Sequence, residues 1–297
     1  MVEFWAQQTL NGLVLGSVYG LYGLGFGLVL ANLKIFHVAH AAVFTWGAVF
    51  AWLLTARLGM PIWLALPVVA LLSGLLNVLA YFIVVRHLLQ RRNTQLAAFI
   101  SSLGALMVLN ELAAKVLGGM VERIPREAYP VHALRLGPLQ FNTLDITIVV
   151  LTALLMLLLG WLLHRTEWGR EARAVAFNRD VAALLGTNVD RISVGVFFLS
   201  GALGGVSATL VAMAFNVISS DLGDTYLVIA IAAMVVGGFG SVTGVLLGGL
   251  LIGLASTYTV AYIESSYRDL VVFILLLLFL VVRPSGLLKT SNELERV

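Results

Sequence analysis

Apolar runs of about 20 residues recur along most of this 297-residue chain. An α-helix rises 1.5 Å per residue, so about 20 apolar residues cover the roughly 30 Å hydrocarbon core of a bilayer. Hydrophobic residues make up 60% of the sequence and charged residues only 11%, whereas soluble domains carry about 25% charge. We therefore predict an all-α fold, a polytopic transmembrane helical bundle that forms a single domain over residues 1–297.

The apolar runs predict about eight or nine membrane-crossing segments. The seventh run is short and is followed by VVGGFGSVTG, so we expect a broken helix pair near 225–262. Nine crossings result if this region crosses twice, and fewer if part of it is re-entrant. The predicted spans are 9–31, 38–56, 61–85, 94–117, 144–163, 192–215, 225–237, 242–262 and 268–282.

The distribution of basic residues predicts the orientation. With nine crossings and the N-terminus outside, the cytosolic segments hold 12 of the 18 Lys and Arg residues. Such a bias is typical of cytosolic loops, so we expect the C-terminus in the cytosol and 118–143 as an external loop. The predicted cytosolic segments are 32–37, 86–93, 164–191, 238–241 and 283–297.

Several classes of protein are excluded or disfavoured by missing motifs. The chain has no cysteine, which excludes disulfides and thiolate metal sites. It lacks GxxxxGK[ST], so it does not hydrolyse ATP by itself, and it lacks HExxH and GxSxG. We predict that the protein is not an enzyme and needs no cofactor or metal. Its basic residues lie in short loops, which argues against binding nucleic acid.

Residues 164–191 form an island of charge between two apolar runs. They hold nine of the 33 charged residues of the chain, so they must lie outside the lipid. The segment predicts one amphipathic helix of about four turns over 170–185. It either lies on the inner membrane surface or docks onto a soluble partner, and its mixture of acidic and basic residues favours docking. The predicted apolar stripe consists of Ala174, Phe177, Val181 and Leu184.

The island and three other stretches carry a resemblance to a known family. The matching stretches are FFLSGALGG (197–205), VGGFGSVTGVLLGG (236–249) and the terminal Arg283, Pro284, Gly286 and Leu287. With the island, they resemble permease subunits of the ABC importers for branched-chain amino acids and related small solutes. His37 stands where Asn is usual in that family, Ala41 where Gly is usual and Thr187 where Ile is usual. These departures leave the solute open.

The resemblance implies a permease domain in a bacterial inner membrane, with 164–191 as its cytoplasmic coupling loop. The implied partners are two cytosolic ABC ATPase subunits, a homologous second permease or a second copy of this chain, and a periplasmic solute-binding protein. The implied ATPase-coupling residues are Gly169, Arg170, Arg173, Ala174, Asn178, Ala182 and Gly186. The alternative is an ion-coupled secondary transporter, which is typically marked by mid-span charges that this chain nearly lacks.

Small and polar residues within the spans give two further expectations. Glycines at four-residue intervals predict close helix packing: Gly12, Gly16, Gly20, Gly201, Gly205, Gly237, Gly238, Gly240, Gly244 and Gly248. Polar groups in the spans are candidates for a substrate path, or else for structural hydrogen bonds: His37, His40, Asn110 and Asn216. Two histidines without a further ligand cluster do not predict a metal site.

Overall fold

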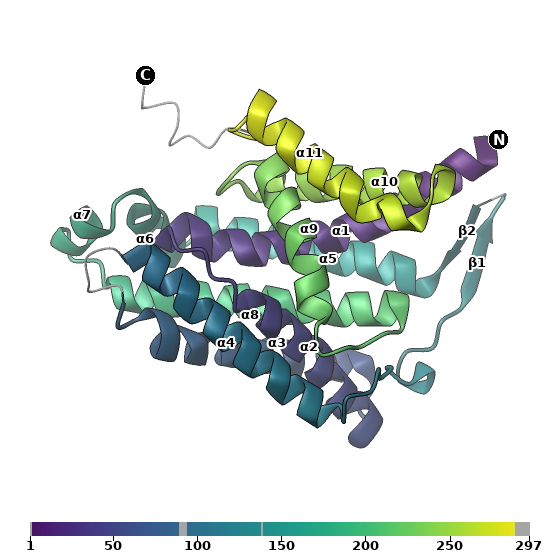
Figure 1. The fold of residues 1–297 in the computed structure, drawn as a ribbon, viewed down its shortest axis with the longest axis horizontal. Helices are drawn as coiled ribbons and strands as arrows, with labels where there is room; N and C mark the ends of the chain where they lie inside the picture. The colour runs from purple at the N-terminus through teal and green to yellow at the C-terminus, as the bar shows by residue number, and fades with distance from the viewer. Residues whose placement is uncertain (1, 89–93, 138, 289–297) are drawn as a thin grey trace. The chain divides into compact units, whose positions relative to one another are not determined.

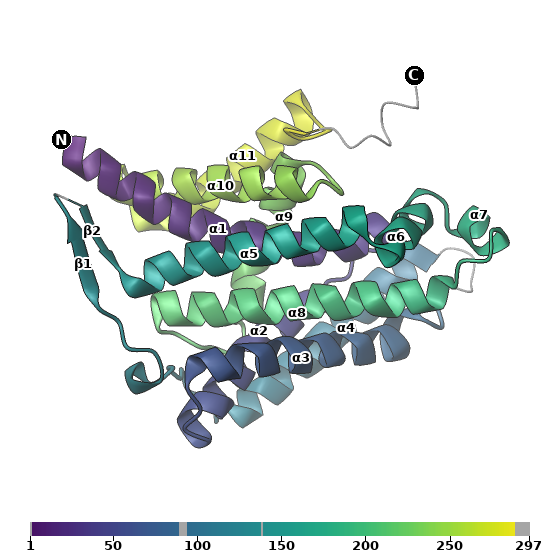
Figure 2. The same ribbon diagram turned by 180° about the vertical axis from the view of Figure 1, so that it is seen from behind.

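The computed structural model describes residues 2–88, 94–137 and 139–288, and it is predominantly helical (Figures 1 and 2). The residues of the predicted cytosolic segments numbered 89–93 and 289–297 lie outside the described residues. The α-helices are α1 (Val2–Leu33), α2 (His40–Trp52), α3 (Ile62–Ala80), α4 (Thr94–Val116), α5 (Thr143–Arg165), α6 (Glu167–Phe177), α7 (Arg179–Leu184), α8 (Val189–Phe215), α9 (Leu222–Gly237), α10 (Val242–Tyr262) and α11 (Arg268–Val282).

Short elements extend or connect these helices. The π-helical turns η1 (Leu53–Arg57) and η2 (Tyr81–Val85) lengthen α2 and α3, and the 3₁₀ turns η3 (Arg126–Ala128) and η4 (Ser265–Tyr267) lie in connections. Strands β1 (Ala133–Leu136) and β2 (Leu139–Asn142) form an antiparallel hairpin in which Ala133 pairs with Asn142.

The predicted polytopic helical bundle is confirmed. Within the described residues, seven helices are long and apolar enough to cross a membrane, and α9 is a shorter apolar helix of 16 residues. The predicted span 38–56 is the 13-residue α2 with η1 at its end. The predicted break in 225–262 lies between Gly237 and Val242, where Gly238 and Gly240 have positive φ angles.

The chain divides into two compact units. Unit 1 comprises Met1–Leu24, Pro130–Leu157 and Tyr226–Val297, and unit 2 comprises Gly25–Tyr129 and Leu158–Thr225. Helices α1, α5 and α9 therefore contribute to both units.

In unit 2, helices α2, α3 and α8 pack through glycines. A Cβ atom on Gly201 of α8 would lie 2.6 Å from the Asn77 Cβ of α3, and one on Gly47 of α2 would overlap the backbone of Gly205. Lipid removes the usual hydrophobic drive for helix association, so close backbone approach supplies the packing energy instead. Gly201 and Gly205, which were predicted to pack helices, both lie at these close contacts.

The connection between α1 and α2, which includes the predicted cytosolic segment 32–37, is largely buried in unit 2. Lys34 is exposed, but His37 is only 1% exposed. The His37 Nε2 atom lies 3.0 Å from Asn77 Oδ1, and the backbone N–H of Val38 donates to Ser102 Oγ at 3.2 Å. A buried backbone N–H needs a partner, and the Ser102 hydroxyl provides one for Val38.

In unit 1, α1 and α10 meet along a glycine seam. A Cβ atom on Gly16 would lie 2.6 Å from the Leu250 Cα, and one on Gly12 would lie 2.9 Å from the Leu254 Cα. Gly20 faces Leu246 on the same seam, and Gly253 of α10 lies against the Gly16 backbone. Further along, Gly237 lies against Gly244, Gly248 against Ala233 and Gly238 against Ser285 and Leu288.

Within each unit, loops predicted to share one side of the membrane touch one another. In unit 2, Arg86 pairs with Asp190, and Glu122 forms a β-bridge with Ile218. In unit 1, the Gln7 side chain exchanges two hydrogen bonds with the Gln140 backbone, and the Leu288 N–H donates to Gly237 O. These contacts agree with the alternation of inside and outside segments that the basic residues predict.

We expect Gly253→Ala to lower the free energy of unfolding by about 1–3 kcal/mol, because the new methyl group would overlap the Gly16 backbone, which cannot rotate away. The matched control is Gly104→Ala in α4, where nothing lies within 4 Å of the added atom. Thermal unfolding of both variants in detergent measures the difference. Equal melting temperatures would show that the α1–α10 seam is looser than described.

Candidate coupling surface

The loop between α5 and α8 is built from two short helices, α6 and α7, and each begins at a side-chain cap. Thr166 Oγ1 accepts the N–H of Gly169 at 3.0 Å. Asn178 Oδ1 accepts the N–H groups of Asp180 at 3.0 Å and Val181 at 3.1 Å. Asn188 Oδ1 accepts the Arg191 N–H at 3.0 Å and thereby begins α8. Each cap satisfies N–H groups that the helix leaves unpaired.

The prediction of one helix over 170–185 is wrong, because the chain breaks at Asn178. This residue has an extended backbone, with φ −153° and ψ 111°, and serves as both the C-cap of α6 and the N-cap of α7. Its side chain competes with the helical backbone for N–H groups, which favours a cap over a helix interior. The break separates the apolar stripe into one part on α6 and one on α7.

The two helices bury small residues and expose larger apolar ones. Gly169, Ala172, Val175 and Ala182 are buried, and Gly169 lies directly against the carbonyl groups of Leu162 and Leu163. By contrast, every member of the predicted stripe is exposed. Phe177 is 65% exposed and Leu184 87% exposed, and the neighbouring Leu185 is 80% exposed. Burial inside this chain therefore does not account for the stripe.

The structure divides the predicted ATPase-coupling residues into two groups. Arg170, Arg173, Ala174 and Gly186 are exposed, and Gly186 has a φ of 92° with open space where a Cβ would stand. Gly169 and Ala182 are buried within the loop, and the Asn178 side chain is used as a cap. The first group is available to a partner, while the second shapes the loop. The coupling role of both groups stays a prediction.

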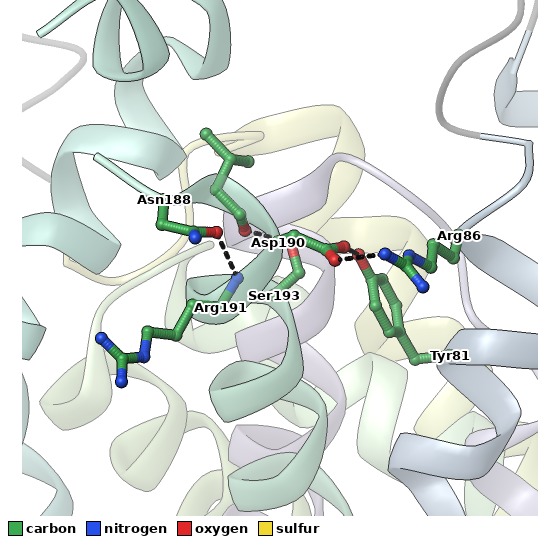
Figure 3. A network of polar contacts seen from close by, with 7 residues as sticks. Tyr81, Arg86, Asn188, Asp190, Arg191 and Ser193 are labelled. Carbon is green, nitrogen blue, oxygen red and sulfur yellow. Dashed lines mark hydrogen bonds and ion pairs between the residues drawn. The ribbon is translucent and has the colours of Figure 1, made fainter. Parts of the chain in front are cut away.

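A polar network ties the start of α8 to the end of α3 (Figure 3). The Tyr81 hydroxyl donates to Asp190 Oδ1 at 2.5 Å, and the Arg86 Nη2 lies 3.0 Å from Asp190 Oδ2. The side chains of Arg86 and Asp190 are 46% and 43% exposed, so solvent screens the pair and its main effect is positional. Sequence reasoning missed this network. The sequence signal for it was that Arg86 directly follows one predicted span and Asp190 precedes another, both on the same predicted side of the membrane.

The residues predicted for a substrate path do not form one site. Both histidines are buried: His37 Nε2 meets Asn77 of α3, and His40 Nδ1 lies 3.3 Å from Ser200 Oγ of α8. Asn110 of α4 donates to Asp224 Oδ2 at 2.8 Å. Asn216 ends α8 in the left-handed conformation, with φ 52°. Packing or capping contacts surround each of them. In the part of the chain that the structure describes, no group of three metal-ligating side chains occurs.

Comparison with known proteins identifies the class of protein. Residues 8–280 match the family model described as "Branched-chain amino acid transport system / permease component". The chain belongs to this family of membrane permease components.

Two relatives match over nearly their whole length. The chain is 30% identical to the high-affinity branched-chain amino acid transport system permease protein LivH of Salmonella typhimurium, covering 99% of this chain and 98% of LivH. It is 29% identical to the permease protein BraD of Pseudomonas aeruginosa, covering 100% and 99%. The fold is similar to a chain in the structure of PsaBC from Streptococcus pneumoniae in complex with Fab. That match has a TM-score of 0.52 and 15% identity, and it covers 96% of this chain and 94% of that one.

We expect Asn178→Ala to destabilise α7 by about 1 kcal/mol, because two N–H groups lose their acceptor. Hydrogen exchange of the α7 amide groups should then speed up about fivefold. Asn178→Asp is the control, since its carboxylate keeps the cap, and it should leave exchange near the wild-type rate. Unchanged exchange in Asn178→Ala would mean that the cap does not hold the helix.

Proposed function

We propose that the protein is the permease subunit of an ATP-driven ABC importer that carries branched-chain amino acids or a related small polar solute across the inner membrane. The exposed apolar stripe on α6 and α7 carries this proposal. Phe177, Val181 and Leu184 project from a loop whose buried side is already filled by smaller residues. Large apolar side chains that stay exposed together outside the membrane spans are typical of a protein interface.

Docking of a protein accounts for the loop better than lying on the membrane surface. Acidic Glu171 and Asp180 are exposed beside the stripe, and anionic lipid headgroups would repel them. A helix that lies on lipid is usually rich in Lys and Arg on its polar face. We therefore assign the stripe to two cytosolic ATPase subunits, one on each permease of a pair.

The remaining partners follow from the family. A second homologous permease, or a second copy of this chain, completes the translocation pathway, and a periplasmic solute-binding protein delivers the solute to its outer face. The N-terminus then lies in the periplasm and the C-terminus in the cytosol. Closure of the ATPase subunits moves α6 and α7, and the spans reopen toward the cytosol.

We expect Leu184→Asp to abolish ATP-dependent uptake while membrane insertion stays normal. The substitution places a charge in the centre of the proposed interface, but Leu184 is 87% exposed and contributes little to the fold. Uptake in cells and co-purification of the ATPase subunits with tagged permease measure the effect.

The matched control for Leu184→Asp is Glu167→Gln in the first turn of α6. Its side chain is 90% exposed and lies away from the stripe in sequence. This control should retain uptake and ATPase binding. Normal uptake by Leu184→Asp would contradict the docking surface.

Reconstitution tests the solute. Proteoliposomes that contain the permease pair and its ATPase subunits, with the cognate binding protein outside, should accumulate radiolabelled leucine only when ATP is supplied inside. Uptake of leucine driven by a proton or sodium gradient without ATP would support a secondary transporter instead. ATP-dependent uptake of another amino acid but not of leucine would keep the importer and change its solute.

A further inference from the structure

A polar pocket lies beside the coupling loop, where α7 meets the start of α8 and the end of η2. Its volume is about 370 Å³, and it is open to the surface. Tyr81 and Arg86 line it from one side, Arg179, Asp180 and Ala183 from α7, and Val189 and Asp190 from the start of α8. All of these residues belong to unit 2. The pocket is thus a feature of one compact unit, next to the proposed interface.

The carboxylate in the wall of the pocket is already satisfied. One oxygen of Asp190 accepts the Tyr81 hydroxyl, and the other is paired with Arg86 (Figure 3). An incoming basic group would have to compete with these two partners. Asp190 therefore organises the wall and is a poor receptor for a cation.

The guanidinium groups leave donors unused. A guanidinium carries five N–H donors in a fixed fork. Among the described residues, Arg86 pairs only with Asp190, and Arg179 forms no ion pair. Arg179 is partly buried and lines the pocket together with Tyr81, whereas Asp180 is exposed. Arg86 and Arg179 thus line the pocket with more N–H donors than Asp190 uses, and the other carboxylate of the lining, Asp180, is exposed.

We propose that this pocket receives an acidic side chain of the cytosolic ATPase subunit, bound by Arg179 and by the remaining donors of Arg86. A carboxylate is the group that a guanidinium fork matches best, because both oxygens accept parallel N–H bonds. The apolar stripe and the pocket then act together: Leu184 and Phe177 provide apolar contact, and the carboxylate fixes the register of α7 on its partner. This inference rests on the proposed function.

Two neighbouring residues of the pocket provide the test. The full-length permease, Arg179→Gln and Asp180→Asn are each co-expressed with the cognate ATPase subunits, and the affinity of the purified permease for those subunits is measured in detergent. Arg179→Gln should weaken binding about tenfold, because a charged hydrogen bond is lost. Asp180→Asn should leave binding unchanged or strengthen it, since a repelling charge is removed.

Other outcomes overturn the proposal. Weaker binding by Asp180→Asn with normal binding by Arg179→Gln would show that the pocket receives a basic group. Equal weakening by both would indicate damage to α7, and no change in either would show that the pocket is not at the interface. An effect of Arg179→Gln that appears only in nanodiscs with anionic lipid would assign the pocket to a lipid headgroup.

Salt dependence gives a second readout. Raising the ionic strength from about 0.05 M to 0.5 M should weaken wild-type binding more than binding of Arg179→Gln, because the variant lacks the screened charge.

Failure of this proposal is distinct from failure of the proposed function. If only the pocket proposal fails, the wild-type permease still binds the ATPase subunits and Leu184→Asp does not. If the proposed function fails, the wild-type permease itself binds no ATPase subunit.

Discussion

The bilayer supplies no water to backbone polar groups and little hydrophobic drive between helices, and the rest of the structure depends on this constraint. Close packing replaces the missing drive, which is why glycines face backbone at the α1–α10 seam and between α2 and α8. The same constraint explains the buried connection between α1 and α2. Its backbone leaves the helical hydrogen-bond ladder, Ser102 accepts the N–H of Val38, and the buried His37 side chain is paired with Asn77.

Outside the lipid the constraint is lifted, and the coupling loop is built differently. Water can satisfy its backbone, so side-chain caps and small buried residues suffice to fold it. Helix α7 has six residues, far below the roughly 12–15 at which an isolated helix becomes stable. Its position therefore depends on the Asn178 cap and on burial of Ala182, not on its own helical propensity. That dependence makes its position sensitive to whatever contacts its exposed side.

The sequence was sufficient to predict the features that follow from composition and spacing. Length and apolarity identify the spans, glycine intervals identify the seams, and the charge island identifies the loop. Asn178 was not predicted as a break. Asn occurs both inside helices and at helix caps, and the sequence alone does not show whether its side-chain oxygen accepts hydrogen bonds from the backbone. The burial of the α1–α2 connection was not predicted, because Lys34 marks an exposed point while the residues after it contact α3 and α4. The Tyr81–Asp190–Arg86 network joins residues more than 100 positions apart, which periodicity along the chain does not reveal.

The network also defines how the loop is connected to the spans. Asp190 follows the α8 cap at Asn188 by two residues, and its carboxylate holds Tyr81 and Arg86 at the end of α3. Helices α3 and α8 are in turn packed through Gly201 against Ser73 and Asn77, and Asn77 donates to the carbonyl of Phe197. The start of α8, directly after the coupling loop, is thus tied by polar contacts to the end of η2, and α3 and α8 are packed against each other. The same Asn77 also holds the buried His37, so these contacts run from Asp190 to the buried connection between α1 and α2 within unit 2. In the importer that we propose, this is the route by which a cytosolic partner reaches the spans.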